Sequence, residues 1–128
     1  MSDVSDSELK TVIADFLEMG HVENIVSMFR KEPQYFEWAG EILQDERFNV
    51  RLGLTILFED LKNQGIDDMS RAIPSLKILL DHESSLIRGE AIGILGIIGN
   101  SEAVELIRSR QNDPNSQVRE MVALVLEE

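Results

Sequence analysis

The chain has 128 residues, 43% of them hydrophobic, and its 24 acidic and 12 basic side chains give a formal net charge of -12. This length indicates a single domain over residues 1–128. The negative charge argues against binding to nucleic acid or to an anionic membrane surface. It leaves another protein or peptide, including a basic one, as the expected partner. No cysteine is present, so disulfides, thiolate metal sites and cysteine catalysis are excluded.

The sequence also argues against a membrane segment. Its longest uncharged apolar run, residues 91–99, is much shorter than the ~20 residues that span a bilayer. The first six residues are acidic and polar, unlike a secretory signal. Together with the lack of cysteine, these features predict a cytoplasmic protein.

Apolar residues recur every three or four positions along nearly the whole chain, a spacing typical of amphipathic helices. Eight helices are predicted, over residues 6–19, 22–31, 33–44, 50–63, 70–80, 85–98, 101–111 and 116–127. Pro33 suits the first turn of a helix. The expected N-caps, whose hydroxyls would accept hydrogen bonds from first-turn N–H groups, are Ser70, Ser85, Ser101 and Ser116. The predicted fold class is therefore all-α.

The chain from residue 34 onward contains an internal repeat. A shift of 31 positions aligns residues 72–95 with 103–126, and a shift of 37 toward the N-terminus aligns residues 80–95 with 43–58. The clearest copies are D-E-R-F-N-V-R, H-E-S-S-L-I-R and D-P-N-S-Q-V-R. Three copies of one helix–turn–helix unit are therefore predicted.

These segments resemble the HEAT repeat, in the short bacterial variety also found in phycobilin lyases. Its unit reads roughly A-[IV]-P-x-L-x-x-L-L-x-D, a turn, and V-R-x-x-A-x-x-x-L-G, which A-I-P-S-L-K-I-L-L-D and I-R-G-E-A-I-G-I-L-G match closely. In the last copy Glu105 replaces the proline and Val122 the alanine. The resemblance implies a right-handed α-solenoid of about four helix pairs. Three recognisable repeats cover residues 34–128, and residues 1–33 form a divergent pair or a cap.

One arginine begins the second helix of each unit: Arg51, Arg88 and Arg119. In the resembling families this arginine forms a ladder with a turn aspartate. The corresponding acidic residues here are Asp45, Asp81 and Asp113, although His82 takes the matching place in the middle unit and Asp81 precedes it. We expect a structural ladder between repeats, with an anion-binding strip as the alternative.

A candidate partner-binding surface follows from the inner face of the second helices. Three glycines share one face of the helix over residues 85–98, opposite its apolar stripe, and each costs roughly 0.5–1 kcal/mol against alanine. Three glycines on one face indicate either that another backbone approaches closely there or that a shallow groove is left open. Exposed apolar surface marks interaction sites, unless the N-terminal helices or the curvature of the solenoid cover it. With the equivalent positions in the sister helices, the predicted surface contains Leu52, Ile56, Glu59, Gly89, Glu90, Gly93, Gly96, Glu120, Leu124 and Glu127.

The aromatic residues are expected to join the N-terminal helices to the repeats. Tyr35, Phe36 and Trp38 lie close together in one predicted helix. We expect four further rings near them, those of Phe16, Phe29, Phe48 and Phe58. Aromatic side chains at helical spacing are typical of a packed core.

The sequence offers no catalytic or metal site. Deoxyhypusine hydroxylases, which are HEAT-like, bind iron through R-H-E-A segments, but here the place reads Arg88-Gly89-Glu90-Ala91. Only two histidines exist, and His82-Glu83 lies in a turn. A HEAT-like DNA glycosylase would need a basic face, which the net charge opposes. We therefore expect no metal and no cofactor.

The predicted function is a non-catalytic scaffold or adaptor that binds a protein on the inner helix face. A lyase-like or accessory subunit that holds a small ligand is the alternative. Self-association through an inner face or an end of the solenoid is a third candidate.

Overall fold

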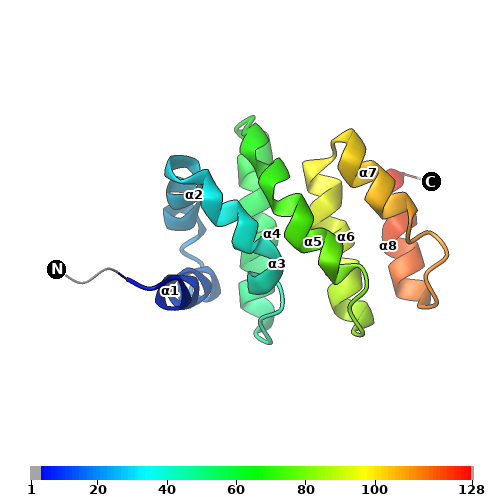
Figure 1. Cartoon of the computed structure of the whole chain (residues 1–128), viewed down its shortest axis with the longest axis horizontal. Coiled ribbons are helices and arrows are strands. Elements are labelled where there is room, and N and C mark those ends of the chain that lie inside the picture. Colours follow the sequence, from blue (N-terminus) through cyan, green and yellow to red (C-terminus); the bar gives the residue numbers. More distant parts are fainter. Residues whose placement is uncertain (1–3, 128) are drawn as a thin grey trace.

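The computed structural model describes residues 4–127, and these residues form helices joined by short turns without any strand (Figure 1). The α-helices are α1 (Asp6–Glu18), α2 (Val22–Lys31), α3 (Ala39–Ile42), α4 (Phe48–Asn63), α5 (Ile73–Leu79), α6 (Ser85–Ile98), α7 (Ser101–Arg108) and α8 (Ser116–Leu126). Two 3-10 segments, η1 (Pro33–Trp38) and η2 (Asp67–Ala72), run directly into α3 and α5. The all-α prediction is confirmed. Residues 1–3 and 128, which belong to the predicted N-terminal pair and last repeat, lie outside the described residues.

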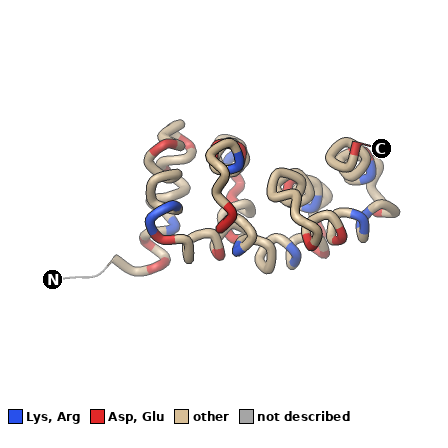
Figure 2. The backbone as a smooth tube through the Cα atoms, turned by 90° about the horizontal axis from the view of Figure 1, so that it is seen from above, with Lys and Arg blue, Asp and Glu red and all other residues tan. Residues whose placement is uncertain are grey.

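From η1 onward the helices form two layers (Figures 1 and 2). One layer contains η1–α3, η2–α5 and α7, and the other contains α4, α6 and α8. In the second layer α4 packs against α6, and α6 packs against α8. Figure 2 shows that this layer is curved, because α6 lies lower in the view than α4 and α8 on either side of it. The arrangement is the predicted α-solenoid, whose handedness remains a prediction.

The N-terminal helices are arranged differently from the later pairs. Figure 1 shows α1 end-on, whereas α4, α5 and α6 are seen lengthwise. Both α1 and α2 pack against α4. A Cβ added to Gly53 would lie 3.0 Å from the Cβ of Leu17, so α1 rests directly on the backbone of α4. This crosswise helix covers the apolar face of α4 that would otherwise meet a preceding repeat.

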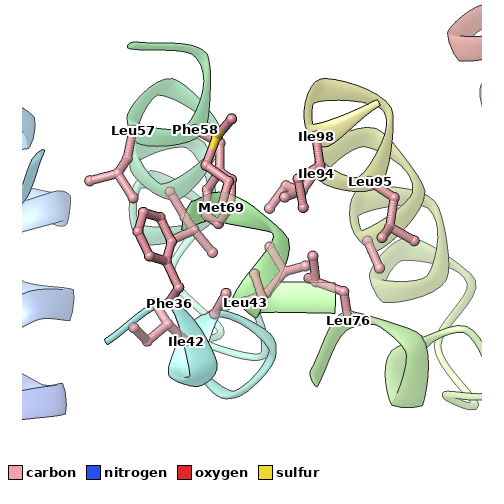
Figure 3. Close-up of a cluster of buried hydrophobic side chains, with 14 of the residues drawn as sticks. Phe36, Ile42, Leu43, Leu57, Phe58, Met69, Leu76, Ile94, Leu95 and Ile98 are labelled. Carbon is pink, nitrogen blue, oxygen red and sulfur yellow. The ribbon is translucent and has the colours of Figure 1, made fainter. Parts of the chain in front are cut away.

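The core lies between the two layers (Figure 3). Its labelled side chains, all buried, are Phe36, Ile42, Leu43, Leu57, Phe58, Met69, Leu76, Ile94, Leu95 and Ile98. The ring of Phe36 packs edge-on against Phe29 of α2 at 5.0 Å and against Phe58 of α4 at 5.9 Å. These rings join the N-terminal helices to the repeats as predicted. Phe48 is 60% exposed at the start of α4, so its predicted place near the cluster was wrong.

The predicted N-caps were displaced. Three caps lie one residue earlier than predicted, at Ser84, Asn100 and Asn115, and their side-chain oxygens accept hydrogen bonds from first-turn N–H groups. Ser70 is no cap either, because it lies inside η2. An N-cap needs an extended backbone, which these three residues have, while the serine that follows each of them already begins the helix. Asparagine caps a helix as well as serine does, so the pattern allowed both choices.

Within the described residues, no helix combines the length and apolar character needed to cross a membrane.

Candidate functional site

The centre of the predicted arginine ladder is a buried ion pair between α6 and the turn before α8. Arg88 donates from Nε and Nη2 to the two carboxylate oxygens of Asp113, both at 3.0 Å. Its Nη1 donates to the backbone carbonyls of His82 at 2.8 Å and Glu83 at 3.2 Å. The Asp113 side chain is fully buried, and Arg110 and the Asn115 amide also donate to it.

The Arg88 hydrogen bonds hold the pKa of Asp113 well below its usual range, although burial opposes the shift. Both guanidinium and carboxylate are occupied by each other and by the backbone. This pair ties two repeats together and leaves no groups free to bind an anion.

The first rung of the ladder uses a different carboxylate from the predicted one. Arg51 donates from Nε to Glu90 on α6 at 2.7 Å, and from Nη1 to the backbone carbonyls of Asp45 and Glu46. Glu90, predicted to bind a partner, therefore belongs to the inter-repeat contacts. Glu90 takes this role because the turn before α6 has no aspartate at the position that Asp113 occupies in the turn before α8. His82 stands there instead, and its Nδ1 accepts a hydrogen bond from the Ser84 amide.

The side chain of Asp45 is held by Arg47 rather than by Arg51. Arg47 donates to the Asp45 carboxylate at 2.9 Å and 3.0 Å and also reaches Asp15 and Glu18 of α1 at 2.9 Å and 3.0 Å. These hydrogen bonds from Arg47 lower the pKa of Asp45. Arg47 thereby links α1 to the turn between α3 and α4. The repeat pattern does not indicate this role, because Arg47 has no counterpart in the other two turns.

The remaining ladder residues make weaker contacts. Arg119 is exposed and donates to the backbone carbonyl of Asp113 at 2.7 Å, with no carboxylate beside it among the described residues. The Asp81 side chain is 88% exposed and lies 3.7 Å from Arg110, not beside Arg88. Its predicted place in the ladder was wrong, because Arg51 and Arg88 take their carboxylates from the following unit.

The predicted partner surface, the inner face of the solenoid, lies on the side of α4, α6 and α8 that points away from the other layer. This is the concave side in Figure 2. By the repeat alignment, Ile56, Gly93 and Leu124 occupy one equivalent position in the three helices. Ile56 is 37% exposed and Leu124 is 71% exposed. A Cβ added to Gly93, or to Gly89 one turn earlier, would meet nothing within 4 Å. The face therefore has large apolar side chains on its two outer helices and open space over the middle one.

Gly96 does not belong to this open face. A Cβ added there would lie 2.9 Å from the Cβ of Val125, so the glycine lets α8 approach the backbone of α6. Its place in the predicted partner surface was wrong. The three glycines share one side of α6 but lie at different heights along it: Gly96 lies where Val125 of α8 comes close, whereas a Cβ added to Gly89 or Gly93 would meet nothing within 4 Å.

Two shallow grooves flank the open glycines on this face. One, of 240 Å³, lies between the α1–α2 corner and α4, and its apolar lining includes Met19, Leu52 and Ile56. The other, of 160 Å³, lies between α6 and α8, and its apolar lining includes Leu86 and Met121. Sequence reasoning missed Met19, Leu86 and Met121. Leu86 was recognisable, because it lies three residues before Gly89 on the same side of the helix.

The acidic and basic side chains of this face differ in whether they have partners within the protein. The side chains of Glu59, Glu120 and Glu127 are exposed and make no ion pair or hydrogen bond within residues 4–127. All four cations on these helices are engaged within the protein, since Arg51 and Arg88 are in the ladder, Lys62 donates to the Ile98 carbonyl and Arg119 to the Asp113 carbonyl. We name the surface formed by Leu52, Ile56, Leu86, Gly89, Gly93, Met121 and Leu124, with these three glutamates, the α4–α6–α8 face.

Comparison with known proteins identifies the repeats. A family model described as HEAT repeats matches residues 36–127. Neither the curated proteins nor the solved structures contain a significant match to the chain.

Proposed function

Because the chain belongs to the HEAT-repeat family, as its sequence predicted, we propose that it is a protein-binding scaffold or adaptor. The α4–α6–α8 face captures the partner, and no catalytic step is involved. HEAT repeats are commonly protein-interaction scaffolds. The proposal places this adaptor in the cytoplasm.

The row formed by Ile56, Gly93 and Leu124 is the observation that carries this proposal. A helix interior normally avoids glycine, and Gly93 has no neighbour whose close approach would require one. Exposed leucine and isoleucine in the flanking helices supply apolar area that a partner would remove from water. Space in the middle with apolar walls on both sides suits an inserted segment of another protein.

The ionisable groups support a non-catalytic role. The carboxyls whose pKa is clearly lowered, those of Asp45 and Asp113, owe the shift to arginines in structural ion pairs. Residues 4–127 contain no group of three or more side chains suited to hold a metal ion.

The test is capture of a partner from the native cell extract by the immobilised full chain, with identification by mass spectrometry. Gly93→Arg fills the open space with a long side chain and should abolish capture while leaving helicity unchanged in circular dichroism. Ile78→Arg is the matched control, because Ile78 is 72% exposed but lies on α5 in the other layer. Unchanged capture by well-folded Gly93→Arg protein would refute the proposed face.

A further inference from the structure

We infer that the α4–α6–α8 face binds an amphipathic helix whose polar sides carry lysine or arginine. This inference rests on the proposed function and names the kind of partner that the face accepts. It follows from three properties of the face: the spacing of its apolar grooves, the nature of its backbone, and its free charges.

The two grooves set the length of the occupant. The 240 Å³ groove beside α4 and the 160 Å³ groove between α6 and α8 are separated by about two helix spacings. At 8–10 Å between axes, this is roughly 16–20 Å. A helix rises 1.5 Å per residue, so about 11–13 residues reach from one groove to the other. An apolar stripe that repeats every three or four residues along such a helix would place one side chain in the first groove and another, about 11–13 residues later, in the second.

A helix suits this face better than an extended segment. The backbone N–H and C=O groups of α4, α6 and α8 are bonded within their own helices, so the face offers no edge that could pair with a strand. An extended peptide would lose its water without gaining backbone hydrogen bonds. A helix satisfies its own backbone and buries only its apolar stripe. The missing side chains at Gly89 and Gly93 leave room for its width in the middle of the face.

Charge selects a basic helix. The face presents Glu59, Glu120 and Glu127 without intramolecular partners among the described residues, while each of its cations is already bound to the protein. Lysine or arginine beside the apolar stripe of the ligand would meet these carboxylates. An acidic helix would meet only like charge on a chain with a net charge of -12.

The experiment uses the full chain and two synthetic peptides of about 18 residues, long enough to span both grooves. Both carry the same leucine stripe, and their polar positions are lysine in one and glutamate in the other. Glycine amide resonances report the site. The lysine peptide should shift those of Gly89 and Gly93 and leave Gly65 and the buried Gly40 unchanged.

Variants separate the contributions of shape and charge. Gly93→Gln fills the open space without adding a charge and should weaken the lysine peptide about tenfold or more, and Ile78→Gln should leave its affinity unchanged. The double variant Glu59→Lys with Glu120→Lys should weaken the lysine peptide by about tenfold and reduce the preference over the glutamate peptide, since both changes act on charge complementarity.

Several results would overturn the inference. Equal affinity for both peptides would remove the role of charge, and shifts confined to other glycines would remove the site. Shifts of Gly89 and Gly93 that grow with protein concentration alone would assign the face to a second copy of this chain. If neither peptide binds while a native partner is still captured in a Gly93-dependent way, the basic helix is wrong and the scaffold proposal stands.

Discussion

The α5–α6 pair and the α7–α8 pair are copies of one sequence unit, yet the same positions lie in different surroundings. Leu80 and Ile92 are buried in the first pair, whereas their counterparts Gln111 and Ala123 are exposed and partly exposed. Within residues 4–127 the middle pair has a neighbouring unit on both sides, and the α7–α8 pair has one on a single side. Gln111 is polar and Ala123 is small, so these two positions expose less apolar surface than leucine and isoleucine would.

The arginine at the start of the second helix shows the same contrast. In α6 it is buried and holds a carboxylate from the next unit, while in α8 it is exposed and reaches only a carbonyl. The neighbouring unit thus decides whether this side chain is a core residue or a surface residue, as expected when each repeat contacts only its neighbours. If covering by a neighbouring unit decides the role of a side chain, substitutions at covered positions should cost more unfolding free energy than those at uncovered positions.

The largest effect is expected from Arg88→Ala. The change leaves the fully buried Asp113 carboxylate without its main partner and two backbone carbonyls without a donor. Breaking a buried pair in this way costs about 3–5 kcal/mol of unfolding free energy. Urea unfolding followed by circular dichroism measures it. The double variant Arg88→Met with Asp113→Leu should recover most of the loss, and a loss below about 1 kcal/mol for Arg88→Ala would show that the pair is unimportant.

Acid should weaken the same pair. The folded-state pKa of Asp113 is lowered, so its ion pair stabilises the protein fully above about pH 5. This stabilisation is lost progressively as the pH falls through the usual aspartate pKa, near 3.9, toward the lower folded-state value. Asp113→Asn removes this contribution, so the difference in unfolding free energy between wild type and variant should shrink as the pH falls. A difference that stays constant from pH 7 to pH 3 would contradict the assignment.

Gly96→Ala should be destabilising although alanine favours helices. The added methyl would meet Val125 at 2.9 Å, and α8 would have to move away from α6. Overpacking of this kind costs about 1–3 kcal/mol, against a gain of roughly 1 kcal/mol in helix propensity. A lowered midpoint of thermal unfolding is expected, and a raised one would show that the α6–α8 contact is loose.

Gly93→Ala tests the uncovered side of the same helix and should have the opposite sign. Nothing lies near the added methyl, so the propensity gain of about 0.5–1 kcal/mol is retained. The midpoint of thermal unfolding should rise. Destabilisation here would contradict the open surroundings of Gly93.

The smallest effect is expected from Arg119→Ala. The side chain is exposed and makes a single hydrogen bond to a carbonyl. Surface substitutions of this kind change the unfolding free energy by no more than about 0.5 kcal/mol. Urea unfolding beside Arg88→Ala gives the direct comparison, and similar losses for the two variants would refute the contrast between a covered and an uncovered arginine.

The helices, their repeat and the place of the three arginines in it could be predicted from the amino-acid sequence alone. These features depend on local spacing, since apolar residues at helical intervals define both a helix and the side that it buries. The candidate face was largely predictable for the same reason, because Ile56, Gly93 and Leu124 share one place in the repeat. The caps were displaced by one residue because serine or asparagine stands at both adjacent positions, and either residue caps a helix well.

Only the tertiary structure decided which partner each side chain meets. Arg51 takes Glu90, 39 residues away, and Arg88 takes Asp113, 25 residues away. Gly96 packs against Val125 while Gly93 stays open. These contacts depend on the offset and tilt between neighbouring helices, which sequence spacing within a single helix does not contain. The physical reason is that a repeat pattern fixes the surface each unit must bury, whereas the geometry of stacking fixes the atoms that bury it.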